Sequence, residues 1–91
     1  MVAFYVLTVI EHGKVEETHY CKTLDVVSKL VARVIDDLEW DDVETAVFDA
    51  STLKSKMAAL VAASRHNRRV DIFDDEEDGR ELFVEEAQLL E

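Results

Sequence analysis

The sequence predicts an α+β fold in which a mixed or antiparallel sheet of four to five strands carries two amphipathic helices on one face, in the order β-β-α-β-α-β-β. Runs of β-branched and aromatic residues lie near both ends of the chain, and two stretches with helical apolar spacing lie between them. The 91 residues contain no proline and no linker-like stretch. We therefore expect a single domain, residues 1–91.

The N-terminal residues 2–10 are almost wholly apolar at both alternating sets of positions, which is typical of a strand in the middle of a sheet. Gly13 lies in a short polar connection, and residues 15–21 alternate well enough to pair back as a β-hairpin. The apolar run is too short to span a bilayer and lacks the features of a signal segment. Cys21 is the only cysteine, so we expect no intrachain disulfide and a cytoplasmic location.

A first helix is predicted from Thr23, a candidate N-cap, to about Leu38. Apolar residues recur there at helical spacing, namely Leu24, Val27, Leu30, Val31, Val34, Ile35 and Leu38. In residues 43–48 the β-branched residues Val43, Thr45 and Val47 then occupy every second position, which is typical of a short strand. The pair Asp41 and Glu44 also resembles a helix capping box, so a helix is the alternative to the strand that we favour.

A second helix is predicted to begin at an N-cap, Asp49 or Ser51, and to end near Asn67. Its apolar stripe contains Leu53, Met57, Leu60 and Val61. Residues 70–73 and 82–84 are two short strand candidates, and the Asp78–Gly79 pair between them indicates a second hairpin. The tail, residues 85–91, fits either an extension of the last strand or a short helix.

The net charge of -11 is arranged in blocks. Residues 36–50 contain seven acids and no base, residues 51–70 contain five bases and no acid, and residues 71–91 contain ten acids and one base. Such an acidic chain would be repelled by nucleic acids and by anionic membranes, so we expect neither to be a direct partner. A basic protein is the expected partner.

The two acidic blocks are the candidate binding surface. Carboxylates one helical turn apart lie at a spacing comparable to that of successive phosphates along a nucleic-acid strand. The candidate partner-binding residues are Asp36, Asp37, Glu39, Trp40, Asp41, Asp42, Glu44, Asp74, Asp75, Glu76, Glu77 and Asp78. Trp40 is included because tryptophan is enriched at binding hot spots, although a place at the edge of the core is the interpretation that we favour for it. Acidic loops that only aid solubility are the alternative for the whole set.

In size and charge, the chain resembles small acidic phage proteins that occupy nucleic-acid-binding sites on restriction, CRISPR or transcription proteins. The resemblance implies a non-enzymatic inhibitor, such as an anti-restriction or anti-CRISPR protein, whose partner handles nucleic acids. A small structural or regulatory module that acts through homo-oligomerisation is the alternative. For the basic block we favour pairing with the acidic loops within one chain. A basic face that pairs with the acidic face of a second copy, in a symmetric homodimer, is the alternative.

No residue pattern indicates catalysis, a metal or another cofactor. His19 and Cys21 share one face of a predicted strand, but no acid is placed to orient them as a nucleophilic pair, and the ligand spacing of zinc sites is missing. Residues 74–79 lack the alternate spacing of a calcium loop. With two glycines there is no phosphate-binding loop. We therefore expect neither an enzyme nor a cofactor-binding protein.

Overall fold

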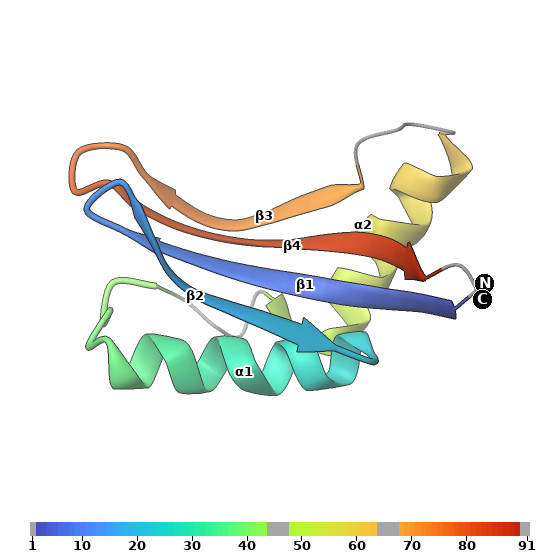
Figure 1. Cartoon of the computed structure of the whole chain (residues 1–91), viewed down its shortest axis with the longest axis horizontal. Helices are drawn as coiled ribbons and strands as arrows, with labels where there is room; N and C mark the ends of the chain where they lie inside the picture. Colours follow the sequence, from blue (N-terminus) through green and yellow to red (C-terminus); the bar gives the residue numbers. More distant parts are fainter. Residues whose placement is uncertain (1, 44–47, 64–67, 90–91) are drawn as a thin grey trace.

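The computed structural model describes residues 2–43, 48–63 and 68–89. In these ranges the chain forms, in order, β1 (Val2–Glu11), β2 (Lys14–Cys21), α1 (Leu24–Asp37), α2 (Ala50–Ala62), β3 (Arg69–Asp75) and β4 (Arg80–Leu89). Figure 1 shows the strands in one sheet and the helices against it. The predicted α+β class is confirmed.

The sheet is antiparallel throughout and has the strand order β2-β1-β4-β3. The two predicted hairpins are β1–β2 and β3–β4, and pairing between β1 and β4 joins them. The apolar strand β1 is central, as predicted. β4 extends to Leu89, so the C-terminal tail continues as a strand up to that residue.

The strand predicted at residues 43–48 is not part of the described sheet. Val43 and Phe48 lie outside any strand, and residues 44–47 are outside the described ranges. The elements in those ranges therefore follow the order β-β-α-α-β-β. Val43 is buried in the core, and its N–H donates to the carbonyl of Trp40 at 3.2 Å. Its apolar side chain is used in a turn that closes onto the core.

Capping hydrogen bonds define both ends of α1. The Thr23 side chain accepts a hydrogen bond from the Val26 N–H at 3.3 Å. At the other end Glu39 has a positive φ of 57°, its N–H donates to the Asp36 carbonyl, and the Trp40 N–H donates to the Ile35 carbonyl at 2.9 Å. These two bonds form a Schellman motif, which reverses the chain and directs Trp40 back to the core.

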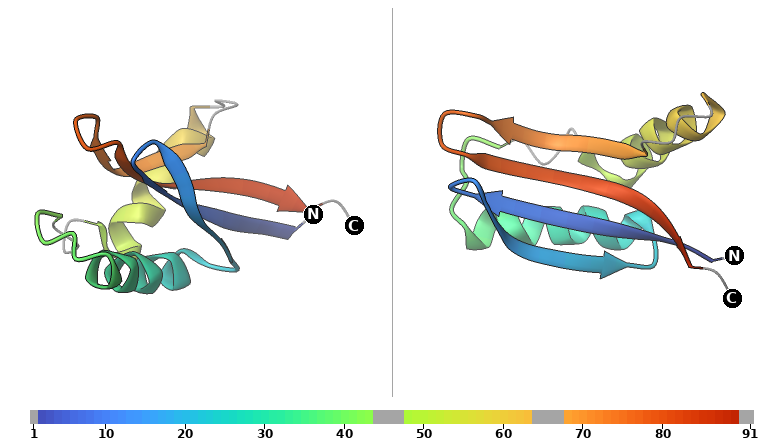
Figure 2. Two further views of the ribbon diagram at one scale, coloured as in Figure 1. Left: turned by 60° about the vertical axis from the view of Figure 1, so that its left-hand side comes forward. Right: turned by 45° about the horizontal axis from the view of Figure 1, so that its top comes forward.

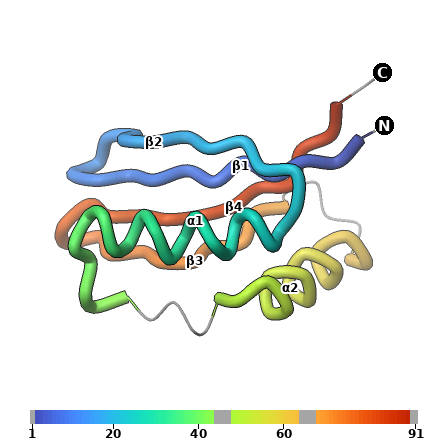
Figure 3. The backbone as a smooth tube through the Cα atoms, turned by 90° about the horizontal axis from the view of Figure 1, so that it is seen from below, coloured from blue at the N-terminus to red at the C-terminus, as the bar shows by residue number. Residues whose placement is uncertain are grey.

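The second helix is capped by Asp49, whose carboxylate accepts from the Thr52 N–H at 2.9 Å. Its last helical residue is Ala62, and residues 64–67, where the predicted end lies, are outside the described ranges. Leu53 and Met57 are buried as expected, but Val61 is 42% exposed. The buried stripe of α2 is therefore narrower than predicted, because this helix packs beside β3 near the edge of the sheet (Figure 3).

Both helices cover the same face of the sheet, as predicted (Figures 1 and 3). The core between the two layers is formed by Leu7 and Val9 from β1, Leu82 and Val84 from β4, and the apolar residues of α1, α2 and β3 that face them. Figure 2, right, shows the opposite face of the sheet, which no described segment of the chain covers. We refer to it as the outer face.

Candidate functional site

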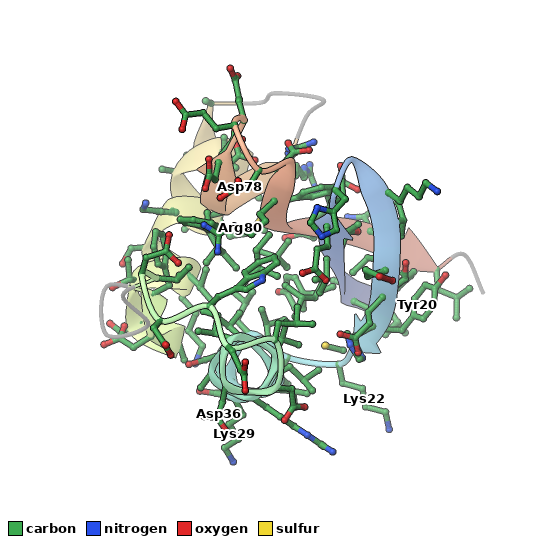
Figure 4. The ribbon with its side chains drawn as sticks, turned by 90° about the vertical axis from the view of Figure 1, so that its left-hand side faces the viewer. Tyr20, Lys22, Lys29, Asp36, Asp78 and Arg80 are labelled. Atoms are coloured by element: carbon green, nitrogen blue, oxygen red, sulfur yellow. The ribbon has the colours of Figure 1, made fainter. Side chains whose placement is uncertain are left out.

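One end of the molecule collects the two acidic segments. The end of α1 with its following loop, the β1–β2 turn and the β3–β4 turn all lie on the left in Figure 1, and Figure 4 views this end directly. The Gly13 N–H donates to the Gly79 carbonyl at 3.0 Å, which joins the two hairpin turns. We name this region the acidic end; it contains Asp36, Asp37, Glu39, Asp41, Asp42, Asp74, Asp75, Glu76, Glu77 and Asp78.

Arg80 connects the two segments. Its guanidinium donates two hydrogen bonds to the Asp42 carboxylate, from Nη1 at 3.1 Å and from Nη2 at 2.8 Å. Nη2 also donates to Asp75 at 2.7 Å and lies 3.6 Å from an oxygen of Asp78. Asp42 comes from the loop after α1, whereas Asp75 and Asp78 come from the β3–β4 hairpin. The separate acidic blocks of the sequence therefore form one site in the fold.

Trp40 lies beneath this site. It is 2% exposed, its ring centroid is 5.9 Å from that of Phe73, and the Arg80 guanidinium lies 5.4 Å from the Trp40 ring centroid and 5.3 Å from that of Phe73. The structure thus places Trp40 in the core, as the favoured interpretation of the sequence expected, and not on the surface as a partner-binding residue. It supports Arg80 from below, by packing and by cation–π attraction.

Hydrogen bonds within the cluster favour the charged forms of Asp42 and Asp75. Hydrogen bonds from Arg80 hold the pKa of Asp42 and that of Asp75 below their usual value, and the same carboxylates raise the pKa of Arg80. The Arg80 side chain is only 15% exposed, and its buried Nε has no hydrogen-bond partner in the described part of the chain. One cation thus holds three anions, and the cluster remains net negative.

The other carboxylates of the acidic end point to solvent. Within the described ranges, Asp37 is the only one of them in an ion pair. Its carboxylate lies 3.8 Å from Arg33 on the exposed surface of α1. Those in no such pair are Asp36, Glu39, Asp41, Asp74, Glu76 and Glu77, all exposed. Glu44, the remaining predicted site residue, lies outside the described residues. Most of the predicted acidic set is therefore available to a partner.

The basic block does not neutralise the acidic end. Lys54 pairs with Asp25 at 3.3 Å at the start of α1, and Arg68 pairs with Glu86 at 2.9 Å. Arg69 lies 2.7 Å from Asp71 and 3.5 Å from Glu81. The predicted pairing of bases with acids within one chain is therefore present for these residues, but their partners lie in the strands and in α1.

His19 and Cys21 do not form a reactive pair. His19 Nε2 lies 3.3 Å from the Glu17 carboxylate, whereas Cys21 is buried and its burial raises the pKa of the thiol. Burial therefore disfavours the thiolate that a nucleophile needs. In residues 2–43, 48–63 and 68–89, no three potential ligands gather as a metal site would require.

Sequence reasoning missed Arg80 as the organiser of the acidic end. The available signal was that Arg80 is the one base in residues 71–91, directly after the Asp78–Gly79 turn. A lone base inside an acidic run is the natural ion-pair partner of carboxylates that the fold brings together. Which carboxylates these are depends on tertiary contacts, since Asp42 lies 38 residues away along the chain.

Comparison of the chain with protein-family models, with curated proteins and with solved structures gives no match. Neither α1 nor α2 is long and apolar enough to cross a membrane, and no other helix is found in the described ranges.

Proposed function

We propose that the chain is a non-enzymatic interaction module whose acidic end binds a basic surface of a partner protein. The observation that carries the proposal is the junction at Arg80, which unites carboxylates from the loop after α1 and from the β3–β4 hairpin. A dispersed acidic surface would have suited solubility equally well. A single concentrated surface favours binding, because clustered charge steers a complementary partner and fixes its orientation.

Contacts of Arg80 also hold part of the acidic end in one arrangement, which favours binding. Asp42, Asp75 and Asp78 are held by one guanidinium that rests on Trp40 and Phe73, so the base of the surface is rigid. The exposed carboxylates around it can therefore meet a partner at a low cost in ordering. Arginine and lysine side chains on the partner would form charge-assisted hydrogen bonds with them.

We further propose that the partner handles nucleic acids and that binding blocks its basic site. Clustered carboxylates carry the same sign of charge as a phosphate backbone and would be attracted to the same basic site. The size and charge of the chain support the more specific proposal that it is a phage inhibitor of the anti-restriction or anti-CRISPR kind.

The test uses one charge reversal from each acidic segment. Asp41→Lys with Glu77→Lys leaves the Arg80 cluster intact, since neither residue belongs to a described ion pair. Glu16→Lys with Glu85→Lys changes the net charge equally, at exposed positions that belong neither to the acidic end nor to a described ion pair. Each tagged protein would be used to capture partners from a lysate of its native host, and binding of the recovered partner would be titrated.

We expect the unaltered chain to recover a basic protein, with an affinity that falls as salt rises. The acidic-end variant should bind at least tenfold more weakly, and the control should bind nearly as the unaltered chain does. Equal affinity of the acidic-end variant and the control would overturn the proposal. Circular dichroism of each protein confirms that the fold is retained.

A further inference from the structure

An apolar strip runs along the outer face of the sheet over β1 and β2. Leu7 and Val9 are fully buried towards the helices, and side chains alternate along a strand, so the even-numbered residues of β1 lie on the outer face. The pairing registers continue this face onto β2 and onto the end of β4. We name this surface the outer strip; it includes Phe4, Val6, Ile10, Val15, Tyr20 and Leu89.

The outer strip is continuous and exposed to solvent. Tyr20 is 75% exposed, Val15 62% and Leu89 58%. The ring centroids of Phe4 and Tyr20 lie 6.3 Å apart, which links β1 to β2 across the strip. Figure 2, right, shows that no described segment of the chain lies over it. Single exposed apolar residues need no explanation, but a contiguous group marks an interaction surface.

Acidic residues border the outer strip on its β4 side. The register between β1 and β4 places Glu85 beside Val6 and Glu81 beside Ile10, and Asp74 of β3 lies opposite Glu81. Glu85 and Asp74 are exposed, and neither belongs to an ion pair in the described ranges. We name this border the acidic row; it contains Asp71, Asp74, Glu81 and Glu85.

Arg69 is the only base that the registers of the described strands place on this face. Its guanidinium lies 3.6 Å from the centroid of the Phe83 ring and is paired with Asp71 and Glu81. Arg69 therefore covers Phe83, which is 9% exposed, and ends the apolar surface on the β3 side. One guanidinium beside four carboxylates leaves the acidic row net negative.

We propose that the outer strip and the acidic row bind an amphipathic α-helix of a second partner protein, with the apolar stripe of that helix on the strip and its basic residues over the row. The strip spans two neighbouring strands about 4.8 Å apart, so it is about 10 Å wide, which is the width of one helix. β1 has 10 residues, and at about 3.3 Å per residue its length matches a helix of about 20 residues. Lysine and arginine side chains on one flank of the helix would reach Glu85 and Glu81, one strand spacing away, and form charge-assisted hydrogen bonds.

Charge selects a basic helix over a second copy of this chain. Each copy has a net charge of -11, and two strips packed face to face would bring two acidic rows into one interface. A second sheet is also wider than the strip and would cover the polar surface over β3. A helix needs only the strip, and its basic flank is attracted to the acidic row.

A hollow at one end of the strip provides a place for an anchor residue. It has a volume of about 350 Å³ and is lined by Phe4, Tyr20, Cys21, Lys22 and Leu89. A large apolar side chain of the helix would fill it, and buried anchors of this kind contribute most of the energy at protein interfaces. The hollow lies at the opposite end of β1 from the β1–β2 turn, away from the acidic end. The proposal therefore adds a second surface and does not rest on the function proposed for the acidic end.

The primary test uses a designed peptide of about 20 residues with leucines on one helical face and lysines along one flank. We expect it to bind the unaltered chain with a micromolar dissociation constant in calorimetric titration, and to shift the amide NMR signals of β1, β2 and the end of β4. A control peptide with glutamine in place of every leucine keeps the charge and should bind at least tenfold more weakly. Equal affinity of the two peptides, or shifts confined to the acidic end, would overturn the proposal.

Variants of the outer strip test its apolar contribution. Tyr20→Ser with Val15→Ser should weaken binding of the leucine–lysine peptide at least tenfold, because two highly exposed apolar side chains are lost. The matched control, Val26→Ser with Val61→Ser, removes two exposed valines from the helices and should bind as the unaltered chain does. Unchanged affinity of the β2 variant would contradict the outer strip as the site. If that variant does not fold, the NMR shifts of the unaltered chain still test the location.

A crossed comparison keeps the two proposals separate. Glu16→Lys with Glu85→Lys should weaken binding of the peptide and preserve binding of the partner captured by the acidic end. Asp41→Lys with Glu77→Lys changes the net charge equally and should do the reverse. Equal loss of the peptide by both variants would mean that only long-range attraction holds it, and would refute the outer strip as the site. Failure of the acidic end to capture a partner leaves the peptide assay intact.

Sedimentation equilibrium tests the other occupant of this face. The unaltered chain should have the 10.4 kDa mass of a monomer without peptide. A dimer that the leucine–lysine peptide does not dissociate would show that a second copy covers the strip, and would overturn the proposal.

Discussion

Arg80 and Asp42 form a two-point ion pair, at 2.8 and 3.1 Å, between elements that are 38 residues apart in the chain. This pair fastens the loop that follows α1 to the hairpin between β3 and β4. Since Asp75 shares the same guanidinium, the pair also decides that two acidic segments become one surface. Stability of the fold and layout of the acidic end therefore depend on the same contact.

Replacing Arg80 should detach the loop after α1 from the β3–β4 hairpin and destabilise the fold. In Arg80→Ala, three carboxylates face each other with no cation between them, and Trp40 and Phe73 lose their cover. We expect a clear fall in the thermal midpoint and a red shift in the emission of Trp40, the only tryptophan. Arg33→Ala, which removes an exposed pair with Asp37, should change the free energy of unfolding by less than about 0.5 kcal/mol. Equal effects of both changes would contradict the structural role of Arg80.

The Arg80 cluster should also produce a defined pH dependence. The pKa of Asp42 is lowered in the folded chain from its usual 3.8, mainly by the hydrogen bond from Arg80. Asp42 ionisation therefore stabilises the fold above about pH 3.8, and the contribution is lost as the pH falls through the folded-state pKa. Asp42→Asn should be less stable than the unaltered chain at neutral pH and equally stable in strong acid. Denaturant unfolding across this range measures the difference, and a constant difference would contradict the assignment.

The two glycines allow a matched comparison. Both have positive φ, 75° for Gly13 and 64° for Gly79, so alanine at either position should cost about 1–2 kcal/mol. A Cβ at Gly79 would in addition lie 2.7 Å from the Gly13 nitrogen, whereas one at Gly13 meets nothing within 4 Å. Gly79→Ala should therefore destabilise the chain more than Gly13→Ala in denaturant unfolding. The reverse order would argue against contact between the turns.

Truncating a buried side chain of α2 should lower the free energy of unfolding much more than truncating an exposed one. Leu53 is fully buried, and Leu53→Ala should reduce the free energy of unfolding by about 2–5 kcal/mol, because a cavity is left in the core. Val61 is 42% exposed on the same helix. Val61→Ala should have an effect within about 0.5 kcal/mol. Comparable losses in thermal or denaturant unfolding would mean that Val61 is packed in solution.

Cys21 should behave as an inert thiol in the folded chain. It is 2% exposed, and burial raises the pKa of its thiol, which lowers the fraction of thiolate. Reaction with a thiol reagent at mildly alkaline pH should be slow in the folded chain and fast in denaturant. Rapid reaction without denaturant would show that the β2 end opens readily.

Several elements could be predicted because their signals are local. Three kinds of signal depend only on neighbouring residues, and all are present in the fold. They are the apolar spacing from Leu24 to Leu38, the helix caps Thr23 and Asp49, and the Asp78–Gly79 turn. The exposure of Val61 and the contact between Trp40 and Arg80 could not be predicted in the same way. The first depends on how closely α2 packs on the sheet, and the second on which distant residue the fold places over the Trp40 ring.

The sequence by itself determined the α+β class, the two hairpins, the central place of β1 and the division of charge into blocks. Only the tertiary structure decided that the acidic blocks meet at one end and that Arg80 joins them. The physical reason is the range of the interactions. Helix caps, turns and apolar periods act over a few residues, whereas the Arg80–Asp42 pair and the β1–β4 pairing join distant residues that only the folded chain brings into contact.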